Sequence, residues 1–216
     1  MIRKITFSLT VVMVLSACSR YRGGSIEGYV FDAADGRPLE GVIVVAFWEL
    51  ESGWHGDTYG VLRADESLTD DAGYFHIPAW DPVWVNEGAL STSAPMVLFF
   101  KSGYQLLIKS NSIQPPDYDP EVWESEYNGK RFALLPFEGD IKEYAGHISH
   151  LKFFLKGTYS IGDACYWEKI PVFTRAVLMM QDSFNKQGIY NELPSAEPLR
   201  RKGECRNPQE LLGGIK

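Results

Sequence analysis

The sequence predicts a mainly β fold, an antiparallel β-sandwich that is extended by helices at its C-terminal end. Two observations support this prediction. In the first half, short β-prone segments recur at close intervals, separated by turn signals rich in Asp, Gly and Pro. After residue 138, apolar residues recur with the period of an α-helix instead.

The first predicted strand covers residues 25–31, where β-prone residues alternate. The loop DAADGRPLEG separates it from VIVVAFWEL at 42–50, a β-branched and aromatic run. In LTDDAGYFHI at 68–77, Asp70 can hydrogen-bond the following backbone and Gly73 can adopt a positive φ, so we expect a turn between two strands. The stretch PMVLFFKSGYQLLIKS at 95–110 predicts two further strands around a Ser-Gly turn.

These motifs resemble those of carboxypeptidase regulatory-like domains, which run G-x-V, G-x-P-L and G-V-x-V, then T-D-x-x-G-x-F and K-x-G-Y. The matching positions are Gly28, Val30, Gly36, Pro38, Leu39, Gly41, Val42, Thr69, Asp70, Gly73, Phe75, Gly103 and Tyr104. The resemblance covers about residues 25–110. It implies a transthyretin-like (prealbumin-like) Greek-key β-sandwich that serves as a scaffold or binding module. Two stretches depart from the family pattern, at 51–67 and 78–95, and we interpret both as insertions between strands.

The sequence lacks the motifs of the catalytic classes that we considered. The zinc carboxypeptidases that give the domain its name bind metal through H-x-x-E, and none of the histidines is followed by Glu at that spacing: His55, His76, His147 and His150. A G-x-S-x-G nucleophile motif and a phosphate-binding glycine loop are also missing. We therefore expect no enzyme, no cofactor and no metal.

Residues 1–17 have the pattern of a secretory signal peptide, with two basic residues, an apolar stretch and two small residues. The apolar stretch is shorter than the roughly 20 residues of a membrane-spanning helix. The sequence LSAC at 15–18 resembles the lipobox of bacterial lipoproteins. This resemblance implies cleavage before Cys18, acylation of that residue, and attachment to a membrane of the bacterial cell envelope. Ser19 resembles the outer-membrane class, which implies the periplasmic face of that membrane.

Cys165 and Cys205 remain once Cys18 is acylated, an even number in an oxidising compartment. We expect a disulfide between them that holds the polar C-terminal tail. Two unrelated buried thiols are the alternative.

The second half predicts a last strand at 131–137 and two helices. The first helix has Asp140 in its first turn and ends before Gly157, and the second runs from Pro171 to Gln187. The predicted organisation is a signal peptide at 1–17, a tether at 18–24, the sandwich at 25–110, and the last strand with the helical extension at 111–216.

Three tryptophans in the presumed insertions are candidate ligand contacts: Trp54, Trp80 and Trp84. Aromatic rings next to carboxylates can stack on sugars, but tryptophans also pack loops onto a core. His147 and His150 have the spacing of a metal pair, yet helical geometry places His150 opposite the apolar face and His147 on its edge, so we expect polar surface rather than a metal site. Four aspartates lie near the predicted turns: Asp32, Asp35, Asp70 and Asp71. Their spacing does not match the closely spaced Asp-x-Asp pattern of a calcium-binding loop.

The chain has 216 residues, of which 45% are hydrophobic, and a formal net charge of −7. It can bury a core, and its acidic character disfavours a nucleic-acid partner. We expect a lipid-anchored periplasmic protein that serves as a non-catalytic structural or protein-interaction module and contacts an envelope protein. A carbohydrate-binding module that uses loop tryptophans is the alternative. A hydrolase or a metal-binding protein is a third hypothesis.

Overall fold

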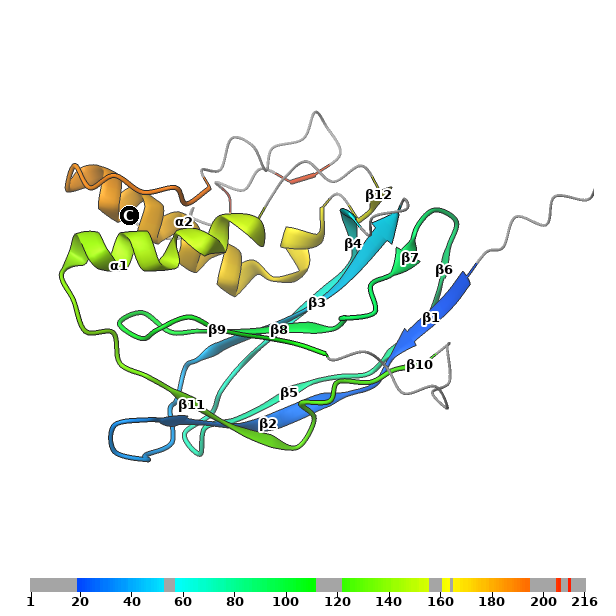
Figure 1. Ribbon diagram of the computed structural model, residues 1–216, viewed down its shortest axis with the longest axis horizontal. Coiled ribbons are helices and arrows are strands. Elements are labelled where there is room, and N and C mark those ends of the chain that lie inside the picture. Colours follow the sequence, from blue (N-terminus) through cyan, green and yellow to red (C-terminus); the bar gives the residue numbers. More distant parts are fainter. Residues whose placement is uncertain are drawn as a thin grey trace, which may run out of the picture.

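The computed structural model describes residues 19–52, 57–111, 122–155, 161–163, 165–194, 205–206 and 210. The predicted signal peptide, Cys18 and Trp54 lie outside these residues. The fold is mainly β with helices toward the C-terminus, which confirms the predicted fold class. It has three layers, formed by an outer β layer, a central sheet and a layer of helices (Figure 1).

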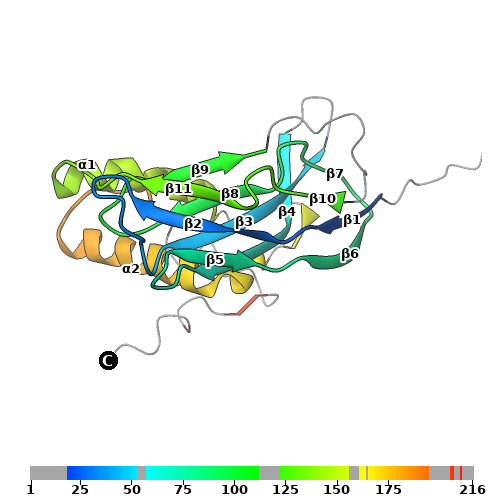
Figure 2. The same ribbon diagram turned by 90° about the horizontal axis from the view of Figure 1, so that it is seen from below.

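The outer layer is long and consists of two short sheets end to end (Figure 2). Its middle strands are β1 (Ser19–Gly23) and β2 (Ile26–Asp32). On one side they pair antiparallel with β6 (Trp80–Val85) and β5 (Tyr74–Ile77). On the other side they pair parallel with β10 (Val122–Trp123) and β11 (Lys130–Leu134).

The central sheet has the strand order β12-β4-β3-β8-β9. Its long antiparallel pair is β3 (Ile43–Ser52) and β4 (Asp57–Leu68). The others are β8 (Met96–Phe100), β9 (Leu107–Ser110) and the two-residue β12 (Ile161–Gly162). The short strand β7 (Ala89–Leu90) pairs with the end of β3.

Helices cover the face of the central sheet that points away from the outer layer (Figure 1). They are α1 (Ile141–His147), the 3-10 helices η1 (Ile148–Phe153) and η2 (Tyr166–Lys169), and α2 (Pro171–Lys186). Asp140 caps α1 and forms a capping box with Glu143, as expected for an acidic residue at this position. The first predicted helix is shorter than expected, because the chain changes to 3-10 geometry at Ile148.

Strand β3 is apolar because both of its faces are buried. Val44, Ala46 and Trp48 belong to the core between the outer layer and the central sheet. Val45 and Phe47, which alternate with them, belong to the core beneath the helices. A strand covered on both faces needs apolar side chains at consecutive positions. This burial explains why the sequence VIVVAFWEL is almost entirely apolar.

Three predictions about organisation are wrong. The tether at 18–24 is largely strand β1, and its Tyr21 is buried in the core. The insertions at 51–67 and 78–95 contain strands β4 and β6. The sandwich extends beyond the predicted boundary at residue 110, because the predicted last strand is confirmed as β11 and pairs with residues 28–32 of β2. The sequence pattern missed β1 and β6, which are distant in the chain and pair with each other. It also missed β4, although β4 pairs with the preceding strand β3.

Two signature positions have clear structural roles. Thr69 is buried, and its hydroxyl donates to the Leu39 carbonyl at 2.5 Å and accepts from the Val42 N–H at 2.8 Å. Gly73 has φ of +74°, and a Cβ there would lie 2.3 Å from the Val30 carbonyl oxygen. These residues tie the first loop to the β5 turn.

Candidate functional site

The outer face of the outer layer is a sheet surface over which no described helix lies (Figure 2). Alternation along β2 turns Gly28 and Val30 inward and leaves Tyr29 exposed. Phe31 shares the outward direction of Tyr29. The cross-strand partners of Tyr29 are Tyr74 on β5 and Arg131 on β11. We call Tyr29, Phe31, Tyr74 and Arg131 the aromatic strip.

Ring contacts order the aromatic strip. The centroids of Tyr29 and Tyr74 are 5.3 Å apart, and those of Tyr29 and Phe31 are 6.5 Å apart with planes 29° from parallel. The Arg131 guanidinium lies 4.0 Å from the Phe31 ring centroid, which is cation–π geometry. Because the rings support one another, a ligand would meet a surface whose side chains are already ordered.

A carboxylate lies at the edge of the strip. The Tyr74 hydroxyl donates to Glu27 Oε2 at 2.7 Å, and this bond is the main cause that raises the pKa of Tyr74. The backbone N–H of Glu27 donates a hydrogen bond to Asn128 Oδ1 at 2.9 Å. His76 is the cross-strand partner of Glu27. The strip therefore brings aromatic rings, a guanidinium and a carboxylate together on one surface.

Sequence reasoning did not identify the strip. It assigned Gly28, Val30 and Phe75 to a structural signature, whereas Tyr29 and Tyr74 lie between the signature positions. The signal was present in the alternation of IEGYVFD, since aromatic residues between inward-facing positions must point outward. That no described helix packs over them is a property of the tertiary arrangement.

The candidate tryptophans do not form a common platform. Trp80 is 5% exposed and packs edge-on against Trp48 at 5.6 Å between ring centroids, so its interpretation as an exposed ligand contact is wrong. Trp84 is 62% exposed, with the Arg20 guanidinium 5.7 Å from its ring. Trp54 lies outside the described residues. Burial of Trp80 follows from the position of β6 in the outer layer.

A surface pocket of about 420 Å³ lies where β1 and β6 meet β10. Its lining includes Arg22, Trp80, Asp81 and Glu124, so charges of both signs surround it. Gly23 forms part of the wall, and a Cβ at this glycine would lie 2.0 Å from the Trp80 indole nitrogen. His76 is not among the lining residues.

The histidine pair does not form a metal site. His147 is half-buried and its Nε2 accepts a hydrogen bond from the Leu106 N–H at 2.9 Å, while its ring lies 5.2 Å from that of Phe137. Burial, together with the nearby His150, lowers the pKa of His147. His147 lies at the edge of the apolar face, as helical geometry predicts. The expectation that it is only polar surface is wrong, because its ring joins α1 to the segment before β9.

Two of the aspartates near the turns accept hydrogen bonds from neighbouring backbone groups. Asp70 Oδ1 accepts from the backbone N–H groups of Ala72 and Tyr74. Asp32 accepts from the Ala34 N–H and from the Tyr104 hydroxyl, and the latter bond raises the pKa of Tyr104. This is ordinary turn chemistry.

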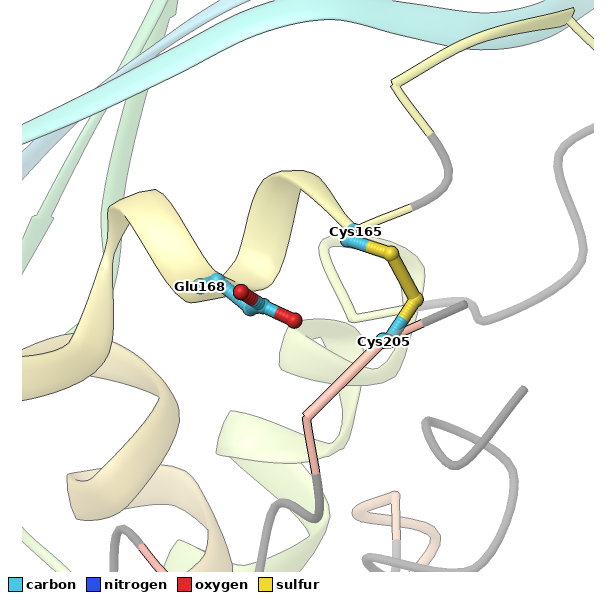
Figure 3. A group of neighbouring side chains, drawn as sticks. All are labelled: Cys165, Glu168 and Cys205. Atoms are coloured by element: carbon cyan, nitrogen blue, oxygen red, sulfur yellow. A yellow bond between two sulfur atoms is a disulfide. The ribbon is translucent and has the colours of Figure 1, made fainter. Parts of the chain in front are cut away.

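Cys165 and Cys205 form a disulfide, as the cysteine count predicts (Figure 3). Glu168, one turn after Cys165, accepts from the Arg206 N–H at 2.6 Å. Among the described residues these three side chains are the one group with metal-like spacing. Both sulfurs are already bonded to each other, so the cluster anchors the chain near residue 205 to η2.

No protein-family model matches the chain, and no curated protein matches it either. Among solved structures, the chain is similar to a 3-chlorocatechol 1,2-dioxygenase from Rhodococcus opacus. The identity is 15% and the TM-score 0.32, over 55% of this chain and 62% of that one. A hydroxyquinol 1,2-dioxygenase from Pseudomonas putida matches with 18% identity and a TM-score of 0.31, over 54% and 57%.

A pilus backbone protein of group B streptococcus matches with 16% identity and a TM-score of 0.27, over 53% of this chain and 41% of that one. The chain thus spans less than two thirds of the length of these proteins. The likeness is one of β-sandwich fold. The finer family named above from sequence motifs has no support in these comparisons.

The dioxygenase neighbours contradict the expectation that the chain is no enzyme. At these identities and TM-scores the likeness assigns no activity to this chain. No helix in the described part of the chain has both the length and the apolar character needed to cross a membrane.

Proposed function

We propose that this chain is a lipid-anchored protein of the bacterial cell envelope, attached through Cys18 to the periplasmic face of the outer membrane, which binds an envelope protein through the aromatic strip. The signal-peptide and lipobox patterns at 1–18 support the anchor. The disulfide supports an oxidising compartment. The motif resemblance to carboxypeptidase regulatory-like domains supports a binding module as well.

The observation that carries the binding proposal is the arrangement of Tyr29, Phe31 and Tyr74 around Arg131 on a sheet face that no described helix covers. Tyrosine and arginine are enriched at protein interfaces, where they supply much of the binding energy. Their ring contacts hold them in place before a partner arrives, which lowers the entropy that binding must overcome.

Crosslinking in intact cells, followed by purification of the lipidated protein, tests this proposal. We expect wild-type chain to capture a partner protein reproducibly and in stoichiometric amount. The double variant Tyr29→Ala with Arg131→Ala should capture at least tenfold less of this partner, because hot-spot residues are lost. Tyr190→Ala is the matched control, because Tyr190 is 84% exposed at the end of the helical layer. Equal capture by the double variant, or no captured protein with wild-type chain, contradicts the proposal.

A glycan ligand is the second candidate, and one observation favours it. Tyr29 and Phe31 present rings 29° from parallel beside Glu27, an arrangement of stacking surface and hydrogen-bonding group that suits a sugar. Calorimetric titration with soluble N-acetylglucosamine oligomers tests this alternative. Binding that disappears in Phe31→Ala, and persists in Trp84→Ala, would place glycan recognition on the strip rather than on the tryptophans of the insertions.

A further inference from the structure

We propose that the end of the outer layer at which β1 begins lies directly against the membrane, with Arg20 and Trp84 in the layer of phospholipid headgroups. This inference rests on the proposed acylation of Cys18. It adds a second interaction surface, at the opposite end of the outer layer from the aromatic strip, with a lipid surface as its partner.

The first step is that no free linker separates the anchor from the folded body. Strand β1 begins at Ser19, the residue after Cys18, and Ser19 pairs with Val85 of β6. Two residues further on, Tyr21 is buried in the core and packs edge-on against Trp123. An acyl chain on Cys18 would therefore hold the sheet itself.

The second step is a comparison of lengths. Arg20 follows Cys18 by two residues, so its Cα lies within about 7 Å of the Cα of the acylated residue. The headgroup region on each side of a bilayer is about 5–7 Å thick. Trp84 is the cross-strand partner of Arg20, so both side chains lie at headgroup depth or at its boundary.

The third step is the chemistry of this end. Trp84 is 62% exposed and neighbouring Val83 is 39% exposed, while the Arg20 guanidinium lies 5.7 Å from the Trp84 ring. Tryptophan is enriched at membrane–water interfaces because its ring is apolar with one polar edge. A guanidinium binds phosphate oxygens in a forked geometry and is attracted to anionic lipids. An exposed Trp–Arg pair beside the anchor fits a phospholipid surface.

The arrangement fixes the orientation of the molecule. In Figure 1 the start of β1 and the end of β6 lie at one end of the long axis, and α1 lies at the other. Tyr29 follows Ser19 by ten residues of nearly continuous strand, which spans about 30 Å. The contact at Arg20 and Trp84 would thus hold the aromatic strip away from the membrane that anchors the chain.

Spin labelling of the full lipidated protein in vesicles tests the inference. The vesicles contain phosphatidylethanolamine and phosphatidylglycerol. Trp84→Cys introduces a single free thiol, because Cys18 is acylated and Cys165 is paired with Cys205. We expect the accessibility of a nitroxide at this position to a water-soluble nickel chelate to fall at least fivefold when the protein moves from detergent into vesicles. Arg20→Cys should behave in the same way and guards against a local disturbance at position 84.

His76→Cys is the matched control, since His76 is exposed on the same layer but belongs to β5. Its label should keep its accessibility in vesicles. If the labels at 20 and 84 stay as accessible as the one at 76 although mass spectrometry shows acylated Cys18, this inference is overturned and the anchor proposal stands. An N-terminal peptide without acyl mass overturns both.

Discussion

Glu66 on β4 caps helix α2 at Phe173, because its Oε2 accepts a hydrogen bond of 2.8 Å from the Phe173 backbone N–H. Its other oxygen accepts from the Val172 N–H at 2.7 Å. The N-cap residue itself, Ile170, makes no side-chain cap bond. A carboxylate from the central sheet therefore satisfies the orphan donors of a helix more than one hundred residues further along the chain.

Removal of this cap should weaken the contact between helix and sheet. We expect Glu66→Ala to lower the free energy of unfolding by about 1 kcal/mol, the usual cost of losing an N-cap. Chemical denaturation at neutral pH measures the change. Glu138→Ala, at an exposed position before α1, should leave the midpoint nearly unchanged. Equal effects of the two variants would show that Glu66 acts only through surface charge.

The same carboxylate should give the fold a pH dependence. Burial raises the pKa of Glu66 above its ordinary value of 4.5, against the two backbone hydrogen bonds, which lower it. A raised pKa means that the folded state holds this proton more tightly than the unfolded state. The stability from this group is therefore full below the ordinary pKa and is lost as pH rises through the raised one.

Glu66→Gln removes this titration, and the comparison isolates it. We expect the stability of wild-type chain relative to Glu66→Gln to fall as pH rises from the ordinary pKa of 4.5 through the raised one. Urea denaturation of both proteins across this range provides the measurement. A relative stability that rises with pH would mean that the helix N-terminus outweighs burial.

Thr69 should be sensitive to loss of its hydroxyl. Thr69→Val keeps the shape but leaves the Leu39 carbonyl and the Val42 N–H without the side-chain partner that each has in the fold. We expect a loss of about 1–3 kcal/mol in thermal or chemical denaturation. Thr69→Ser keeps the hydroxyl and should retain most of this stability. Similar losses in both variants would assign the role of Thr69 to its methyl group instead.

The disulfide should contribute substantially to stability. It closes a loop of 40 residues in sequence separation, which corresponds to about 4 kcal/mol in the loop-entropy description. Cys165→Ser with Cys205→Ser should therefore unfold at clearly lower denaturant concentration than wild-type chain, and reductant should shift wild-type chain toward the variant. Reductant should have no effect on the double variant itself, which serves as the control.

The sequence by itself determined several local features. Alternation predicts β2, and the Asp-Gly turn predicts the start of β5, since short-range sterics and hydrogen bonds set both. Pro171 predicts the first residue of α2 for the same reason. The cysteine count predicts the disulfide.

Only the tertiary structure decided which surfaces are covered. Trp80 is buried because β6 joins the outer layer, and His147 is half-buried because the Leu106 backbone donates to its ring. Tyr29 stays exposed because the described helices pack on the other sheet. Periodicity reports that a face is apolar or polar, but contacts between distant segments determine what packs against it. For this reason the aromatic strip and the Arg20–Trp84 pair emerged from the fold rather than from the sequence.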